Sequence, residues 1–456
     1  MPVDRPNVVL IVADDQRFDT LGALGNDRIA TPNLDRLVAE GCAFTRHHNA
    51  GADQGAVCVP ARAMLHSGRS LFRLEGPGGI TTDHPPLPGR FREAGYHAVG
   101  TGKWHNGIDA FDRCFDAGRD VYFGGMGNHW NVPVASREPG GEWPDPIPHR
   151  TFSGTGSLWT TDQVAERYTD GDHSSEVFAD AAVDVIEGEE SPFFAYMATM
   201  APHDPRTAPG EYLSRYDPAD LPLPESFRPE HPFDNGHLDL RDEGLATHPR
   251  DPEEIRRHIA DYYAMITHLD AQVGRVLDAL EATGERGDTL VAFTADHGLA
   301  VGRHGLMGKQ NLYDHSLRVP LLLSGPGVPA GERRDVLSVH YDLYPTLCEL
   351  AGLAAPVDLD GESLVPAIED GTAPREALLC AYEDEMRAVR EGDLKLIEYA
   401  VAGRRHTQLF DLAADPAETV DRSEDPASAD DLARLRDRLG TLRREHGDPA
   451  GWDARA

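Results

Sequence analysis

The 456-residue sequence predicts an α/β fold, with a large, mostly parallel or mixed sheet sandwiched between helices. Two observations predict it. Short apolar runs alternate with segments whose apolar residues recur at helical spacing, which is typical of a sheet covered on both sides. Near residue 370 the pattern changes to short strands and one amphipathic helix. We therefore expect an α/β domain over residues 1–370 and a small C-terminal α+β subdomain of antiparallel strands and a terminal helix over residues 371–456.

The expected strands of the first domain are short apolar runs. Residues 7–13 (NVVLIVA) are continuously apolar and rich in β-branched residues, which is typical of a strand buried on both faces. Further strands are expected at residues 96–100, 193–200, 290–294 and 319–323.

The expected helices are marked by capping residues or by apolar spacing. Thr31 and Pro32 are typical of a helix N-terminus, and Gly41 follows as a stop. Two more helices are expected, over residues 87–94 and 253–282. Residues 121–172 and 202–252 are instead rich in Pro and His, and we expect irregular loops that form the walls of a substrate pocket.

The C-terminal subdomain is predicted from two patterns. Short antiparallel strands are expected at residues 377–382, 388–390 and 395–399. A terminal amphipathic helix is expected behind Ser428 as its cap, because apolar side chains recur at helical spacing at Leu432, Leu435, Leu439 and Leu442.

The composition excludes two classes of partner. A formal net charge of −34 provides no attraction for nucleic acid and repels anionic membrane surfaces. No apolar run approaches the roughly 18–20 residues of a membrane span. The five cysteines have no paired spacing, and no secretory signal is visible at the N-terminus, so we expect a cytoplasmic protein. Only three of the 43 basic residues are lysines, at positions 103, 309 and 395.

Polar residues follow several of the predicted strands. Asp14 and Asp15 come directly after the first strand, and Asp296 and His297 come directly after the strand at residues 290–294. The carboxyl ends of parallel strands meet at one edge of a sheet, where ligands bind in open α/β folds. The pattern therefore predicts one composite site, to which Lys103, His105 and His203 also belong.

The strongest local motif is CVPAR, which begins at Cys58. Pro60 suits the first turn of a helix, so Cys58 is expected at a helix N-terminus, where negative charge is stabilised. Arg62 supplies a planar guanidinium for a tetrahedral oxyanion. The alternative, a buried structural cysteine beside a helix start, is not excluded by the pentapeptide alone.

With these motifs the chain resembles the formylglycine-dependent sulfatase family of the alkaline phosphatase superfamily. The resemblance runs through nearly the whole chain in the order of the family's motifs. Besides CVPAR, the similar segments are VLIVADDQR at 9–17, TGKWHNG at 101–107, APHDP at 201–205, FTADHG at 293–298, HGLMGKQNLYDHSLRVPLLLSGPG at 304–327 and LFDLAADPAE at 409–418. It implies an alkaline-phosphatase-like fold and a sulfuric ester hydrolase.

The resemblance also implies residue roles. A separate maturation enzyme would oxidise Cys58 to formylglycine, whose hydrate attacks sulfur and then expels sulfate. Arg62 would stabilise the hydrated aldehyde, and His105 would be the base that collapses the intermediate. Lys103, His203 and Lys309 would hold sulfate oxygens, with His203 or Lys309 protonating the leaving group.

One divalent metal is implied as well. Its ligands would be Asp14, Asp15, Asp296 and His297. The family usually has asparagine where His297 stands, and a nitrogen ligand leaves manganese or magnesium open beside calcium, the first expectation. The second departure is Ala61, where serine is usual, and it bears on maturation of Cys58.

Other interpretations stay open. A phosphonate monoester or phosphate diester hydrolase would use the same scaffold, and a non-catalytic binding module is disfavoured by the complete set of site residues. Sugar, aryl and alkyl sulfates all remain candidate substrates, and the sequence predicts no oligomeric state. Residues 124–130 are either the lining of a substrate subsite or an ordinary glycine turn with a packed tryptophan, and we favour the turn. We interpret His340 as structural, and Lys395 as structural or at the pocket rim.

Overall fold

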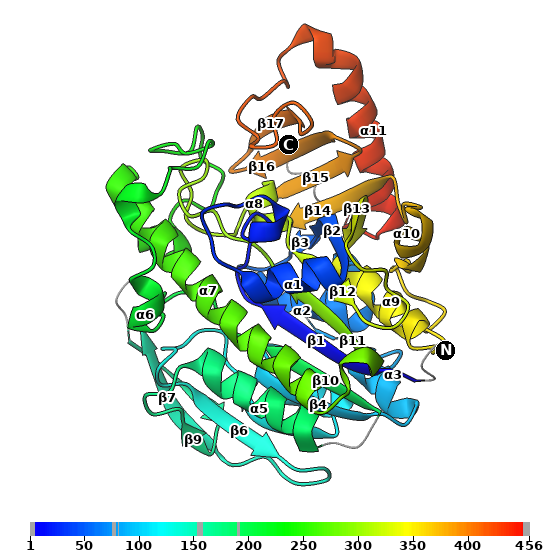
Figure 1. Ribbon diagram of the computed structural model, residues 1–456. Helices are drawn as coiled ribbons and strands as arrows, with labels where there is room; N and C mark the ends of the chain where they lie inside the picture. Colours follow the sequence, from blue (N-terminus) through cyan, green and yellow to red (C-terminus); the bar gives the residue numbers. More distant parts are fainter. Residues whose placement is uncertain (1–4, 75–78, 81, 153–157, 189–191, 450–456) are drawn as a thin grey trace.

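The computed structural model describes residues 5–74, 79–80, 82–152, 158–188 and 192–449. Its centre is a ten-stranded mixed sheet with the strand order β13-β2-β12-β11-β1-β10-β4-β5-β6-β9 (Figure 1). A five-stranded sheet lies at one end of the molecule and carries the C-terminal helix. The expected α/β fold with a small C-terminal α+β part is confirmed.

The parallel core of the large sheet surrounds β1 (Asn7–Ala13). This strand pairs in parallel with β10 (Phe193–Ala198) on one side and β11 (Thr289–Ala295) on the other. Beyond β10 follow β4 (His97–Lys103) and β5 (Ala117–Tyr122), also parallel. All seven residues of β1 are buried, as its continuous apolar sequence predicts.

The other side of the sheet makes it mixed. Strand β12 (Leu321–Ser324) runs antiparallel to β11 and to β2 (Gly41–His48), and β13 (Glu332–Val339) then pairs in parallel with β2. The sequence did not predict β2 or β13, because charged or polar residues interrupt both apolar patterns: Arg46, His47 and His48 in β2, and Glu332 to Asp335 in β13.

Two apolar cores lie on opposite faces of the sheet, and alternate residues of β1 contribute to each. Val9 and Ile11 pack in the core under α1 (Pro32–Glu40), α5 (Ser174–Gly188) and α7 (Pro252–Ala282), the helices nearest the viewer in Figure 1. Val8 and Leu10 pack in the opposite core. Its helices are α2 (Cys58–Ser67), α3 (Leu87–Glu93), α4 (Ile108–Cys114), α9 (Leu343–Leu350) and α10 (Val365–Asp370).

The expectation of an irregular segment over residues 121–172 is wrong. Strands β6 (Pro133–Arg137) and β9 (Arg167–Tyr168) extend the large sheet at its edge, and β7 (Pro146–Phe152) pairs with β8 (Leu158–Val164). Edge and two-stranded positions tolerate the prolines that argued against strands here. Residues 153–157 of the predicted loop lie outside the described part.

Residues 202–252 are irregular as expected. Their helical elements are only single turns: α6 (Gly210–Leu213), η3 (Pro218–Asp220) and η4 (Arg241–Leu245). Short turns elsewhere are η1 (Gly22–Leu24), η2 (Leu71–Arg73), η5 (Arg286–Asp288), α8 (Asp314–Leu317), η6 (His340–Asp342) and η7 (Pro426–Ser428). None of the helices in the described ranges is both long and apolar enough to cross a membrane.

The C-terminal sheet has the order β17-β16-β15-β14-β3. Its antiparallel strands are β14 (Ala377–Tyr382), β15 (Met386–Glu391), β16 (Leu394–Val401) and β17 (Arg404–Asp411), and α11 (Ala429–Glu445) packs on them. Ser428 is the N-cap residue of α11, but its side chain donates and accepts no capping bond. The two-residue β3 (Gly51–Ala52) pairs in parallel with β14, so this sheet reaches back to the segment before Cys58. The boundary at residue 370 stays a prediction.

Candidate active site

Cys58 is the first residue of α2 and is only 3% exposed. Its Sγ lies 3.0 Å from Nδ1 of His105 and 3.9 Å from Nζ of Lys103. Burial would raise the pKa of the thiol, but the positive charges of Lys103 and His105 outweigh it and hold the pKa well below its usual value. The position and charge of Cys58 therefore favour a nucleophilic group over a structural cysteine.

The composite site at the carboxyl ends of the strands forms as predicted. Ala13 pairs with Ala295, which places Asp14 and Asp15 beside Asp296. The backbone N–H of Asp296 donates to Ala13 O at 3.0 Å, and that of Asp15 donates to Oδ1 of Asp296 at 3.3 Å. Lys103 ends β4, and His203 follows β10. Residues far apart in the sequence thus meet at one edge of the sheet.

The two lysines of the site each bind one aspartate. Lys103 Nζ forms a buried ion pair with Oδ2 of Asp14, and Lys309 Nζ donates to Oδ1 of Asp15 at 2.8 Å. The second oxygen of each aspartate has no hydrogen-bond partner among the described residues. Burial would raise the pKa of Asp14, but Lys103 and the other nearby cations hold it well below its usual value. Each of the two carboxylates therefore keeps one oxygen open.

Arg62 is buried and holds the other side of the site. Its Nε donates to Oδ2 of Asp296 at 3.0 Å, and its Nη1 donates to Lys103 O at 3.0 Å and to the hydroxyl of Tyr196 at 3.3 Å. Its Nη2 has no hydrogen-bond partner in the described part of the chain. Arg62 thus fixes Asp296 and keeps one donor for an anion, and Tyr196 is a contact that the sequence did not reveal.

The donor atoms in this site fit a divalent cation. Asp14, Asp15 and His297 each offer a ligand atom, all within 4.8 Å of one another, and so do Cys58, Asp296 and His297. His297 Nε2 is buried, has no hydrogen-bond partner in the described ranges, and lies 3.8 Å from Oδ1 of Asp14. Carboxylate oxygens with an imidazole nitrogen are ligands that divalent metals take in proteins.

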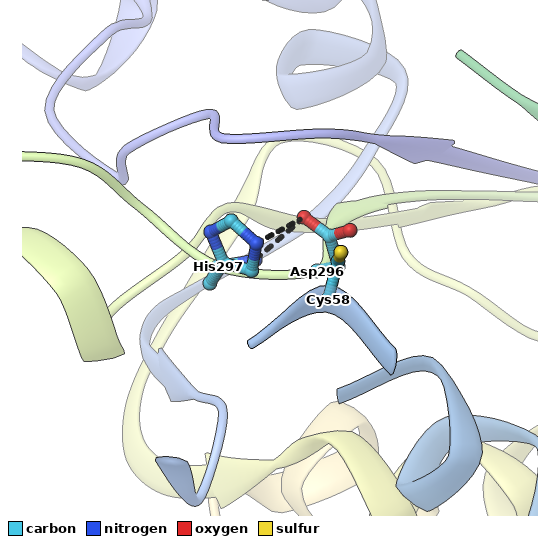
Figure 2. A group of neighbouring side chains, drawn as sticks. All are labelled: Cys58, Asp296 and His297. Atoms are coloured by element: carbon cyan, nitrogen blue, oxygen red, sulfur yellow. Dashed lines mark hydrogen bonds and ion pairs between the residues drawn. The ribbon is translucent and has the colours of Figure 1, made fainter. Parts of the chain in front are cut away.

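The negative charge around His297 also fits a cation. Burial disfavours a charged imidazole, but the negative charges of Asp296 and Asp15 outweigh it and raise the pKa of His297 to about 9. The carboxylates thus stabilise positive charge at the place where a metal would lie. Figure 2 shows that His297, Asp296 and Cys58 point toward one another.

His203 is held by its Nδ1, which donates to the carbonyl oxygen of Asp204 at 2.8 Å. Its Nε2 is 3.9 Å from Oδ2 of Asp15 and therefore points into the site. Arg241 pairs with both oxygens of Asp204 and with Oδ1 of Asp242 at 2.8 Å. Arg241 consequently braces the segment that carries His203, and the only sequence signal for it is its place in the expected pocket wall.

Arg241 is also connected to the segment of Lys309, through Asp242. Asp242 accepts a hydrogen bond of 2.9 Å from Nε2 of Gln310, the residue that follows Lys309. Burial lowers the pKa of Lys309, but Asp15 and Asp242 outweigh it and raise the pKa well above its usual value. Lys309 therefore stays an ammonium donor.

The glycine turn at residues 124–130 contacts the site. The packed tryptophan is confirmed, since Trp130 Nε1 donates to Thr207 O at 2.8 Å. Gly125, however, lies against His105, and a Cβ added at Gly125 would overlap the imidazole. His129 Nε2 donates to His203 O at 3.0 Å. The turn therefore positions two predicted catalytic histidines, which sequence spacing could not show.

Comparisons with known proteins decide the family. The model of the Sulfatase family matches residues 6–353. The chain belongs to the sulfatase family. A second family model, N-sulphoglucosamine sulphohydrolase, C-terminal, matches residues 302–445 of this sulfatase. The expected hydrolase of sulfuric ester bonds is therefore confirmed, while the role of each site residue stays a prediction.

Relatives cover nearly the whole chain. The choline-sulfatase of Rhizobium meliloti is 28% identical over 100% of this chain and 89% of its own. A multifunctional alkaline phosphatase superfamily protein of Trinickia caryophylli is 27% identical over 93% of this chain and 92% of its own.

Two solved structures share the fold of this sulfatase. The phosphonate monoester hydrolase of Agrobacterium radiobacter has a TM-score of 0.76 at 24% identity, covering 97% of this chain and 96% of its own. A structure in complex with its substrate D-glucosamine-2-N,6-O-disulfate has a TM-score of 0.75 at 20% identity, covering 98% of this chain and 99% of its own.

Proposed function

We propose that this sulfatase cleaves a sulfate monoester of a small molecule with a formylglycine made from Cys58 and one divalent metal. The observation that carries the proposal is the position of Cys58 at the start of α2, with His105 3.0 Å from its sulfur and open carboxylate oxygens of Asp14 and Asp15 beyond it. When bound, the metal supplies a Lewis acid that polarises the ester and lowers the pKa of the nucleophile.

The chain's own residues divide into two sides. On the side of Cys58, His105 Nδ1 is close enough to take a proton from a hydroxyl group at position 58. Lys103 Nζ lies 3.9 Å from Cys58 Sγ, and Nη2 of Arg62 is without a hydrogen-bond partner in the described residues. Both groups can stabilise negative charge at position 58. These contacts support the roles expected for all three residues.

The opposite side carries the donors for the leaving group. His203 Nε2 and Lys309 Nζ both lie beside Asp15. The Lys309 ammonium can donate to an ester oxygen, and so can His203 Nε2 when both ring nitrogens carry a proton. Because Nδ1 of His203 is occupied by Asp204 O, only Nε2 is available to the substrate. Either residue can therefore protonate the leaving alcohol.

Calcium is the metal we propose, with manganese as the competitor that the nitrogen of His297 favours. Elemental analysis of the purified protein, followed by reloading of the chelated protein with each metal, distinguishes the two. Higher turnover with manganese at equal occupancy would reverse the assignment.

One alternative has a specific observation behind it. The phosphonate monoester hydrolase structure matches the present fold over nearly its full length, and a phosphonate monoester is likewise a tetrahedral anion. A paired assay with 4-nitrophenyl sulfate and a 4-nitrophenyl phenylphosphonate tests this. We expect the larger kcat/KM for the sulfate, and a large preference for the phosphonate would overturn the proposal.

The same assay, run with a panel of sulfate esters, tests which substrate class the enzyme prefers. One solved neighbour binds a sulfated glucosamine and one relative is a choline-sulfatase, so sugar and alkyl sulfates both belong in the panel beside aryl sulfates.

Intact-mass analysis of the Cys58 peptide after co-expression with a maturation enzyme tests the nucleophile, because conversion exchanges sulfur for oxygen. A fully active enzyme with an unmodified thiol would exclude formylglycine. The cytoplasmic location stays a prediction.

A further inference from the structure

Cys58 contributes a second kind of ligand to the metal site. Its Sγ, a carboxylate oxygen of Asp296 and a ring nitrogen of His297 all lie within 4.8 Å of one another. They reach this point from two elements, since Cys58 starts α2 while Asp296 and His297 follow β11 (Figure 2). Sulfur, nitrogen and oxygen therefore converge in a pocket where all three side chains are nearly inaccessible to solvent.

We propose that the chain in which Cys58 has not been converted to formylglycine binds a thiophilic divalent cation of the Zn²⁺ class, with the Cys58 thiolate, Asp296 and His297 as ligands. Zn²⁺ takes thiolate, imidazole and carboxylate ligands and is usually four-coordinate. Soft thiolate ligands select zinc over calcium and magnesium, which prefer oxygen.

Open valences in the site support this assignment. His297 Nε2 is fully buried and lacks a hydrogen-bond partner within the described residues, while its Nδ1 is 3.1 Å from Gly298 O. Oδ1 of Asp14 is equally unpartnered in that part of the chain, and it lies 3.8 Å from His297 Nε2. Asp14 thus offers a fourth ligand beside His297.

The thiolate form of Cys58 is available for this bond. Lys103 and His105 lie 3.9 Å and 3.0 Å from the sulfur, and both stabilise its negative charge. A thiolate has enough lone pairs to accept from His105 and to bind a metal at the same time.

Maturation would change which metal the site selects. Conversion of Cys58 removes the sulfur and leaves oxygen donors beside His297, so the preference moves from zinc toward calcium or manganese. Zinc would therefore bind the unconverted chain in preference to the mature one, and its bond to Cys58 Sγ would protect the thiol from reaction. The inference concerns the unmodified chain, so it holds or fails independently of sulfatase turnover.

The first experiment uses full-length protein made without a maturation enzyme, with the Cys58 thiol verified by mass and bound metal removed by a chelator. Titration with Co²⁺, a spectroscopic substitute for Zn²⁺, should produce a sulfur-to-cobalt charge-transfer band in the near ultraviolet that saturates at one equivalent. Cys58→Ala should abolish the band, and His297→Asn should weaken binding at least about tenfold. Cys348→Ala removes another buried free cysteine and should keep the band.

A second measurement does not depend on any variant. Iodoacetamide alkylation of Cys58, followed by peptide mass, should slow at least about tenfold with Zn²⁺ and remain unchanged with Ca²⁺ at equal concentration, because only zinc forms a strong bond to the thiolate. A charge-transfer band that survives in Cys58→Ala, the absence of any band in the unmodified protein, or equal protection by Ca²⁺ and Zn²⁺ would each overturn the proposal.

Discussion

Two of the buried charge clusters in the described part of the chain differ in one respect, because only the first keeps atoms without a hydrogen-bond partner. The catalytic cluster comprises Asp14, Asp15, Arg62, Lys103, Asp296, His297 and Lys309. The C-terminal ion cluster comprises His48, Asp314, Arg390, Lys395 and Glu418. Together they contain all three lysines of the chain. Both are almost fully buried, so burial alone does not distinguish a functional cluster from a structural one.

The difference is in the hydrogen bonds. Lys395 Nζ donates to Asp314 at 2.8 Å and to Glu418 at 2.7 Å, while Arg390 donates to Asp314 at 3.0 Å. No buried nitrogen or oxygen of the C-terminal ion cluster lacks a partner in the described ranges. The catalytic cluster leaves atoms open on Asp14, Asp15, Arg62 and His297. In a structural cluster the buried polar atoms satisfy one another's hydrogen bonds, whereas a functional cluster leaves some of them free to bind a ligand.

The largest effect is expected from Cys58→Ala in the mature enzyme. Removal of the nucleophile should lower kcat about 10⁴-fold or more, since the remaining groups retain only binding and charge stabilisation. Steady-state kinetics with a chromogenic sulfate measures this. Cys348→Ala serves as the control and should keep turnover, because Cys348 lies in the apolar core. Near-normal turnover in Cys58→Ala would remove Cys58 from the site.

The two clusters are compared directly by matched aspartate variants. Asp15→Asn should weaken metal binding at least about tenfold and lower kcat about 100-fold or more. Asp314→Asn removes the shared partner of Lys395 and Arg390 and should lower the free energy of unfolding by about 3–5 kcal/mol, while the folded enzyme turns over normally. Metal titration, kinetics and urea unfolding measure the three quantities. If Asp314→Asn abolished turnover at full stability, the distinction between the clusters would be wrong.

Gly125→Ala tests whether the glycine turn positions His105 against Cys58. An added methyl group displaces the His105 imidazole from Cys58, so kcat should fall about 100-fold, the scale of a misplacement of about 1 Å. The pH profile of kcat should shift as well, because His105 is the expected base. Gly127→Ala, whose added Cβ would lie 3.3 Å from the Tyr122 hydroxyl and 3.6 Å from Met200 Cε, is the control in the same turn. Equal effects in both variants would argue for a general disturbance of the loop.

Metal removal gives the smallest expected effect on stability. At a free metal concentration of about 100 times Kd, binding to the folded state alone should add about 2.7 kcal/mol to the free energy of unfolding. Urea unfolding with and without a chelator measures the gain, which Asp15→Asn should reduce. A gain of equal size in Asp15→Asn would place the metal elsewhere.

The sequence predicted the parts of the molecule whose signal is local. Strand β1 was predicted because six consecutive apolar residues after Asn7 leave no exposed face, and α7 because its apolar spacing persists over 31 residues. Asp14, Asp15, Asp296 and His297 come together because they follow strands, whose ends meet at one edge of the sheet. The interpretation of Lys395 as structural agrees with its closed cluster.

The parts that sequence analysis missed depend on contacts between distant segments. Strand β3 has two residues and exists only through its pairing with β14. The importance of Gly125 depends on His105, 20 positions away, and Arg241 braces segments around His203 and Lys309 that no spacing rule connects. The strands β6 and β7 escape prediction because their prolines are typical loop signals, and the two-residue β9 is too short to show a pattern.

The pairing of β3 with β14 also sets when, during synthesis, the segment around Cys58 can complete its folding. Cys58 lies six residues after β3, and the proposed maturation needs an accessible thiol, whereas the folded chain exposes only 3% of Cys58. The strand that completes this pairing begins at Ala377, 319 residues after Cys58. At about 5–20 residues per second, a ribosome takes roughly 16–64 s to cover that distance. The nascent chain thus gives a maturation enzyme an interval of this length before the sheet closes behind the cysteine.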